Sequence, residues 1–409
     1  MRIVSVHPRG FFFVLPLTLL LSSSAWAQEA APAPPAPAPA PAEPMPAPEP
    51  APAPAEMEPA PMLEPAVPAE PMPAPEPEPA GPDLGPISVG AWGRADILFN
   101  NGEDLDDVAS SGLFELHTSG KVHEMFSITA NLVATYNPDI AGTASLLDGI
   151  AQFEPHEAFN IWLGRMLVPV DRSNFSGPWF MAPWLYPGFG FADGQVVVPR
   201  EGPSGRNDGV TIWGSPAGGM FKYYAGVFDL YDVMQSPLYS ARVSVSLLNP
   251  EPGFYNSSTY YGKDLLGIGV GIQAKEDGSV DPTGTAAPDD FIGFNADVLF
   301  EKDLAGSGVL DLEGAVYVFN GDNEPTDAGW FGLVSYLLPN DVGIGKLQPL
   351  VRVQQAFPAA DGADTSTLFD FQLGYIINAY ATRLALGYRL GTAGDVDTQT
   401  IFLGAQVQK

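Results

Sequence analysis

The fold class follows from the stretch ATRLALGYRL at residues 381–390. From residue 383 its even-numbered positions are apolar, while the odd-numbered positions hold two arginines, an alanine and a glycine. A period of two is typical of a β-strand with one apolar and one polar face. The same alternation recurs at 240–247 and 368–377, and it continues through most of the chain beyond residue 87. We therefore predict an all-β protein.

Sixteen segments have this pattern and are long enough to cross a membrane as tilted strands. An even number of strands is typical of bacterial single-chain barrels. The expected fold is a 16-stranded antiparallel transmembrane β-barrel with an infolded third extracellular loop. We expect the strands at about 87–99, 112–121, 125–136, 144–153, 157–165, 208–215, 219–230, 238–247, 264–275, 291–302, 309–320, 328–338, 347–356, 367–378, 381–391 and 397–408.

The chain before residue 87 has a different composition. Residues 1–27 have two arginines, an apolar core and a small-residue cleavage site, which predicts a secretory signal peptide. The apolar run is too short for a retained anchor helix, the weaker alternative. Residues 28–86 are Ala-Pro and Glu-Pro repeats without Lys or Arg, so we expect a disordered Pro/Ala/Glu-rich periplasmic segment. It is either a solvated linker or an arm that reaches toward the cell wall. Residues 87–409 remain for the outer-membrane β-barrel.

Alternation alone does not distinguish a soluble sandwich from a membrane barrel. Short connections alternate with long, acidic, Gly-rich ones, and this asymmetry is typical of periplasmic turns and extracellular loops. The connection 249–263 is long although its place predicts a periplasmic turn, so it is a real exception or hides a missed strand. Small residues crowd the polar faces at Gly267, Gly269, Gly271, Gly374 and Gly387. We expect interfacial aromatic girdles from Phe99, Tyr136, Phe159, Tyr223, Phe300, Tyr336, Tyr380 and Phe402.

Residues 166–208 have no period and form the longest irregular insert in the expected barrel. An insert of this length in a compact domain is usually functional. It follows the fifth strand, so with the first strand running outward it is the third outer connection. We expect it to fold into the barrel and narrow a channel. Its charged residues expected at the constriction are Arg172, Arg200, Arg206, Asp171 and Asp193.

Strand parity places charges of both signs on the expected lumen wall. The selected wall residues are Arg94, Lys222, Arg242, Arg352, Arg383, Arg389, Asp297 and Asp370. One interpretation of each is a solvated lumen charge paired across the wall. The other applies to Arg242, Arg352, Arg383 and Arg389, which would face the loop residues Arg172, Arg200 and Arg206 across the constriction. Ion selectivity depends on charges near the path rather than on net charge. The sequence therefore predicts a weak ion preference of either sign.

Between residues 147 and 242 the chain carries, in order, LLDGIAQFEP, FNIWLGRMLVPVDRSNF, GRNDGVTIWG, KYYAGVFD and LYSARVSV. This succession resembles the phosphate-selective porin O and P family of bacterial outer-membrane porins. The family pattern is a strand ending in Gly-Arg, a Pro-containing loop, an Arg-x-Asp-Gly strand, a Tyr-x-x-Gly-Val-Phe strand and an Ala-Arg strand. The resemblance implies a passive channel, commonly a homotrimer, with basic residues along an anion path. Arg165, Arg206 and Arg242 match its basic positions.

The expected function is an outer-membrane porin for passive diffusion of small polar or ionic solutes, with phosphate and other anions as candidates. The alternative is a structural or adhesive outer-membrane barrel that its Pro-rich arm tethers to the cell wall. The expected location is the outer membrane of a Gram-negative-type cell, reached through the secretory pathway. The expected partners are outer-membrane lipid, further copies of the chain (a trimer by resemblance), the permeating solutes, and peptidoglycan through residues 28–86.

Other function classes have little support in the sequence. A net charge of −30 argues against nucleic-acid binding. His117, His123 and His156 lack the spacing of a metal site, and two of them fall at expected periplasmic turns. We therefore expect no enzyme, no catalytic residues, no cofactor and no metal. The chain has no cysteine, which excludes disulfides and thiol chemistry.

Overall fold

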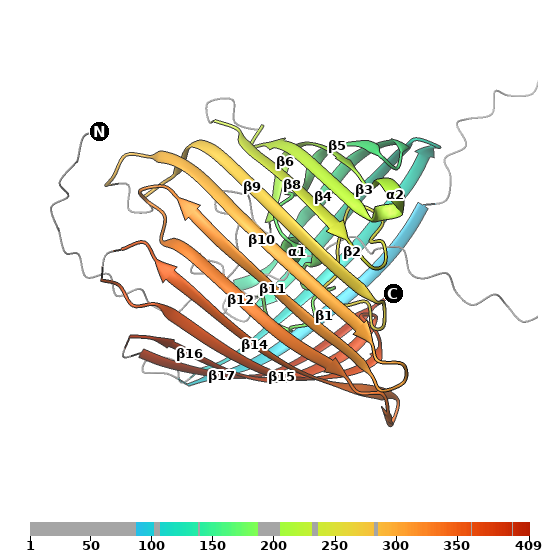
Figure 1. The fold of residues 1–409 in the computed structure, drawn as a ribbon, viewed down its shortest axis with the longest axis vertical. Helices are drawn as coiled ribbons and strands as arrows, with labels where there is room; N and C mark the ends of the chain where they lie inside the picture. The colour runs from blue at the N-terminus through green and yellow to red at the C-terminus, as the bar shows by residue number, and fades with distance from the viewer. Residues whose placement is uncertain are drawn as a thin grey trace, which may run out of the picture. The chain divides into compact units, whose positions relative to one another are not determined.

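The computed structural model describes residues 87–101, 107–137, 140–186, 205–230, 236–281, 285–360, 362–394 and 396–409. The predicted signal peptide and Pro-rich segment lie outside these residues, as do Asp193 and Arg200. Sixteen long strands form one sheet in which neighbours in sequence pair antiparallel (Figure 1). The last strand pairs with the first, with Trp92 opposite Gln408, so the sheet closes into a barrel. The predicted 16-stranded antiparallel barrel is confirmed.

Each predicted strand has a counterpart in the structure. An additional two-residue strand, β13 (Asp341–Val342), pairs with β14, while β12 pairs directly with β14 and so continues the wall. The barrel strands are β1 (Ile87–Asn101), β2 (Asp107–His123), β3 (Phe126–Asn137), β4 (Ile140–His156), β5 (Phe159–Leu167), β6 (Arg206–Gly214), β7 (Phe221–Phe228), β8 (Leu238–Ser246), β9 (Leu265–Ser279), β10 (Asp289–Asp303), β11 (Val309–Asn320), β12 (Thr326–Leu337), β14 (Gly345–Pro358), β15 (Ser366–Asn378), β16 (Thr382–Ala393) and β17 (Val396–Gln408).

The predicted strand ends differ most at β2, which begins five residues earlier than expected. The pairing of β1 with β2 continues from Ala95 opposite Gly112 to Asn100 opposite Asp107. Backbone hydrogen bonds need no apolar side chains, so this polar extension carries no alternation in the sequence. Two short helices, α1 (Arg172–Ser176) and α2 (Pro216–Gly219), lie between strands. No helix in the described part of the chain is both long and apolar enough to span a membrane.

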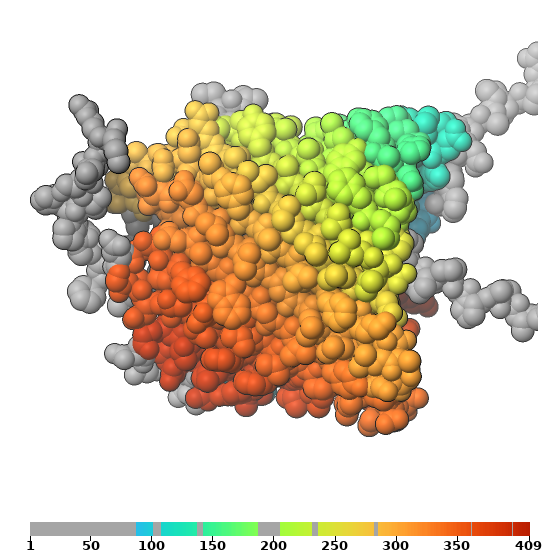
Figure 2. Space-filling view, in the orientation of Figure 1, coloured from blue at the N-terminus to red at the C-terminus, as the bar shows by residue number. Residues whose placement is uncertain are grey.

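The wall is apolar outside and polar inside. On β16, Leu384 and Leu386 are 45% and 47% exposed, whereas Arg383 and Arg389 are buried. Figure 2 shows the outer sides of the yellow and orange strands as a continuous surface. The apolar face therefore points away from the barrel axis, as a lipid-facing wall requires.

Two of the eight predicted girdle residues, Tyr380 and Phe402, are buried on the inside of the barrel. The prediction is wrong for them, because each has an interior partner. The ring of Phe402 covers Gly387 so closely that a Cβ there would overlap it. The hydroxyl of Tyr380 donates to the Thr259 carbonyl at 3.0 Å.

Two connections lie within the ring of strands: residues 168–186, which follow β5, and residues 249–263, which follow β8. Residues 168–186 accept hydrogen bonds from inward side chains of β1, β8, β14 and β16. Only a segment inside the ring can reach strands so far apart around it, and Figure 1 shows α1 among them. The second segment contains no strand, so the long connection is a real exception. Because β5 and β8 end at opposite ends of the barrel, the two segments enter from opposite ends.

Candidate functional site

Four wall arginines hold the inner segment 178–186 by its main chain. Arg94 extends from β1, Arg352 from β14, and Arg383 and Arg389 from β16. The acceptors are the carbonyl oxygens of Pro178 and Trp184 for Arg94, of Leu185 for Arg352 at 2.9 Å, of Met181 for Arg383 at 2.5 Å, and of Tyr186 for Arg389 at 3.5 Å. A guanidinium group offers several N–H donors in a fixed plane. It can therefore bind the main-chain carbonyl oxygens of a segment that forms no regular secondary structure.

These four arginines differ in how their charge is balanced. Arg352 and Arg389 share Asp370, at 2.8 Å and 3.4 Å. Arg94 and Arg383 form no ion pair within 4 Å in the described residues. Their guanidinium carbons instead lie 3.7 Å and 5.5 Å from the ring centroid of Trp184. The nearby carboxylate of Asp96 on β1 is also buried, and it accepts a hydrogen bond from the Trp184 Nε1 at 3.3 Å, so it opposes the positive charge of Arg94 and Arg383 without pairing directly with either arginine.

A second arginine-carboxylate pair explains the glycine repeat of β9. Arg242 on β8 binds both oxygens of Asp297 on β10, at 2.5 Å and 3.0 Å. The strand between them carries Gly269, where a Cβ would overlap the Arg242 guanidinium. Gly271 leaves room for the Val170 carbonyl in the same way. The glycines on the polar face of β9 therefore make room for side chains and main chain that pack inside the barrel.

The loop residue Asp171 is the N-cap of helix α1. Its carboxylate accepts a hydrogen bond from the Asn174 amide at 2.9 Å, which caps the helix N-terminus. It also accepts from the Tyr317 hydroxyl of β11 at 2.5 Å. Burial raises the pKa of Asp171 to about 6, and the bond from Tyr317 opposes that rise. Asp171 thus joins the helix to the wall.

The next residue, Arg172, binds the second inner segment. Its two terminal nitrogens donate to the two oxygens of Glu251 at 2.7 Å and 2.8 Å, and one also donates to the Ser257 carbonyl at 2.8 Å. Both charged side chains are 1% exposed. Burial favours the neutral acid, but the charge of Arg172 outweighs it and holds the pKa of Glu251 well below its usual range. The two inner segments are therefore joined by a buried bidentate ion pair.

The remaining predicted site residues occupy three kinds of place. Arg206 is the first residue of β6 rather than part of the loop, and its Nε lies 3.1 Å from the Asp148 carboxylate of β4. Lys222 on β7 faces inward and donates to the Tyr255 carbonyl at 2.8 Å. Asp193 and Arg200 lie outside the described residues.

Residues 249–263 are held largely by carboxylates of β10 and β11. Glu301 accepts from the amides of Gly262 and Lys263 at 2.7 Å and 2.5 Å, and from the Thr259 hydroxyl at 3.0 Å. Glu313 accepts from the Ser258 hydroxyl. No set of three or more His, Asp or Glu side chains within the described ranges is arranged to hold a metal ion.

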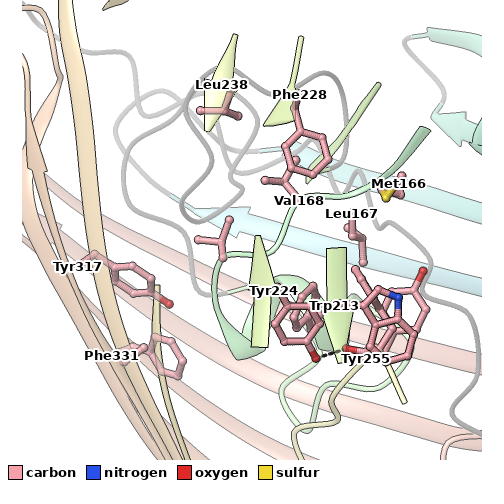
Figure 3. Close-up of a cluster of buried hydrophobic side chains, with 14 of the residues drawn as sticks. Met166, Leu167, Val168, Trp213, Tyr224, Phe228, Leu238, Tyr255, Tyr317 and Phe331 are labelled. Carbon is pink, nitrogen blue, oxygen red and sulfur yellow. Dashed lines mark hydrogen bonds between the residues drawn. The ribbon is translucent and has the colours of Figure 1, made fainter. Parts of the chain in front are cut away.

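An aromatic cluster anchors the first half of the same segment (Figure 3). Phe254 stacks on Trp162 of β5 with ring centroids 4.2 Å apart. The Tyr224 hydroxyl donates to the Phe254 carbonyl at 2.5 Å, and Tyr255 packs edge-on against Trp162 at 5.9 Å. Sequence reasoning missed this role of residues 249–263, although their length and the Phe254-Tyr255 pair were available signals.

The fold is similar to solved bacterial outer-membrane porins. Pseudomonas putida OprB superposes with a TM-score of 0.59 at 10% identity, over 79% of this chain and 94% of its own. Salmonella typhi OmpF, solved in complex with daunomycin, has a TM-score of 0.53 at 13% identity, over 78% and 97%. A trimer form of Vibrio cholerae OmpT has a TM-score of 0.50 at 12% identity, over 79% and 99%. No protein-family model and no curated protein sequence matches the chain.

Proposed function

We propose that the chain is an outer-membrane porin through which small polar or ionic solutes diffuse passively. The supporting observation is the closed barrel with an apolar exterior and a charged interior, narrowed by residues 168–186. Such a wall matches lipid outside and water or polar groups inside. The porin fold of the solved structures above is consistent with this proposal.

Anions are the proposed preferred solutes, with phosphate as a candidate. Arg94 and Arg383 support this preference, because no carboxylate of the described residues neutralises them at ion-pair distance and both face segment 178–186. The resemblance to phosphate-selective porins supports the same choice. The buried carboxylate of Asp96 on β1 and those of Glu301 and Glu313 on β10 and β11 oppose it, so the expected preference is weak.

The remaining assignments complete the proposal. The connection after β5 is the third extracellular loop, with Asp193 and Arg200 among its constriction residues. Residues 1–27 direct export and are removed, and residues 28–86 form a periplasmic arm that reaches peptidoglycan. The barrel assembles as a trimer in outer-membrane lipid, an assignment supported by the family resemblance and by the trimer form of Vibrio cholerae OmpT.

Planar-bilayer recording tests the proposal. Purified protein should produce discrete conductance steps, and a salt gradient should give a reversal potential of the anion-selective sign. Replacing Arg383 by Gln should move that potential toward zero, because it removes an inner positive charge. A folded protein that produces no conductance steps would refute the proposed porin function.

One observation favours a second candidate, a structural or adhesive barrel. The inner side chains are almost fully buried, including Arg352 at 0% and Arg242 at 1% exposure, so two inner segments fill much of the interior. A plugged barrel tethered by residues 28–86 would show heat-modifiable mobility on gels without conductance.

A further inference from the structure

We infer that residues 249–263 form a second constriction of the channel, and that Glu251 positions it through Arg172. The inference rests on the proposed porin function and deepens it. It assigns to the segment the size limit for the permeating solute. Glu251 is a positioning residue, since it acts by holding the segment in the lumen.

The segment is seated like part of a protein core rather than like a surface turn. Residues 254–259 are all buried, and Ser258 and Thr259 are inaccessible. Main-chain amides of the segment bind Glu301, and the Phe254 ring stacks on Trp162. A turn that served only to connect β8 with β9 would need none of these contacts.

The two inner segments support each other. The Ser258 amide donates to the Phe180 carbonyl of the other segment at 2.9 Å. The bidentate pair of Arg172 with Glu251 lies against Gly267, where a Cβ would overlap the guanidinium. The absence of a side chain on the wall at this point is therefore what admits the ion pair. A solute must pass both segments, which enter from opposite ends.

Removing the carboxylate charge should release the segment. In Glu251→Gln the Arg172 guanidinium stays buried and loses its bidentate partner. The only other carboxylate within 4 Å in the described residues is Asp297, 3.9 Å from the Arg172 Nε, and both of its oxygens are already bound by Arg242. Breaking a buried pair in this way is strongly destabilising. The matched control is Asp264→Asn, at the first residue after the segment. It removes a carboxylate that pairs with Lys302, and both side chains of this pair are on the surface. A surface pair contributes little, so the control should leave the segment seated.

Single-channel recording is the first measurement. Glu251→Gln should raise the conductance and admit larger polyethylene glycols than the unmodified protein does, and Asp264→Asn should change neither. Glu251→Asp keeps the charge and should restore part of the size limit. Heat-modifiable mobility on gels shows that each variant is a folded barrel.

Thiol labelling is the second measurement, and it is independent of conduction. The chain has no cysteine, so Ser257→Cys supplies one thiol at a position that is 4% exposed. A small water-soluble methanethiosulfonate should label it slowly in the otherwise unmodified protein. Adding Glu251→Gln should speed the labelling on the order of 100-fold, the opening expected from loss of one partner of a buried pair.

The outcomes separate the two proposals. An unmodified channel that conducts, with unchanged size limit and labelling in Glu251→Gln, overturns the second constriction and leaves the porin intact. A folded protein and variant that both fail to conduct overturn both proposals. Conductance that appears only in Glu251→Gln supports the constriction and replaces the open porin by a plugged barrel.

Discussion

Replacing Gly404 by Ala should unseat the inner segment 178–186. Gly404 lies on the inner face of β17, and a Cβ there would overlap the Trp184 ring, with Nε1 only 2.7 Å away. The ring carbons Cε2 and Cζ2 lie closer still, so the ring must retreat by roughly 1.5 Å to reach ordinary contact distance. Two contacts hold Trp184 in place. Its main-chain amide donates to the Gln372 side-chain oxygen at 2.6 Å, and the Arg94 guanidinium stacks on its ring.

The cost follows from these contacts. Overpacking a closed interior costs about 1–3 kcal/mol, and weakening a hydrogen bond adds about 1 kcal/mol. A total of about 3 kcal/mol corresponds to roughly a 100-fold shift between the seated and released segment. The wall hydrogen bonds are untouched, so the barrel itself should stay folded.

The assay is thiol labelling of Ala182→Cys, a position that is 2% exposed. Labelling should become roughly 100-fold faster when Gly404→Ala is added. The matched control is Gly332→Ala on β12, where the nearest atom is the Trp330 Cζ3 at 3.9 Å and no overlap arises. Equal labelling rates in the Gly404 and Gly332 variants would refute the reasoning.

Three further predictions concern the other inner contacts. Because burial raises the pKa of Asp171 from 3.8 to about 6, the segment 168–186 should be most firmly seated below pH 4 and lose on the order of 2–3 kcal/mol as the pH rises from 4 to 7. Labelling of Ala182→Cys across this pH range should show the loss, and Asp171→Asn should abolish it. Arg352→Met should lower the unfolding temperature seen by gel mobility. The buried Asp370 loses its hydrogen bond from Arg352 and keeps only Arg389 at 3.4 Å, which should cost about 1.5–3 kcal/mol; an unchanged temperature would contradict this. Phe254→Ala should cost about 3–5 kcal/mol by leaving a cavity, and it should enlarge the channel like the loss of the Glu251 charge; an unaltered size limit would count against the aromatic anchor.

Much of the wall could be predicted from the sequence, because strand alternation is a local property. In ATRLALGYRL the side-chain period of two assigns Arg383 and Arg389 to one face whatever the rest of the chain does. Parity likewise puts Asp370 and Arg352 on the inner face, and the register then sets them directly opposite each other on neighbouring strands. The strand ends could not be predicted as closely, because backbone pairing continues into polar residues that do not alternate with apolar ones.

The interior was beyond such reasoning. The partner of Arg172 is Glu251, which lies 79 residues away on a connection expected to be a periplasmic turn. Neither segment has a period, so no local rule places their side chains. The sequence pattern predicts Tyr380 and Phe402 as girdle residues, yet both side chains point inward. The Tyr380 hydroxyl binds the Thr259 carbonyl there, and the Phe402 ring packs on Gly387. Alternation thus dictates a barrel with a charged lining, whereas the contents of that barrel depend on contacts that exist only once the wall has closed around two irregular segments.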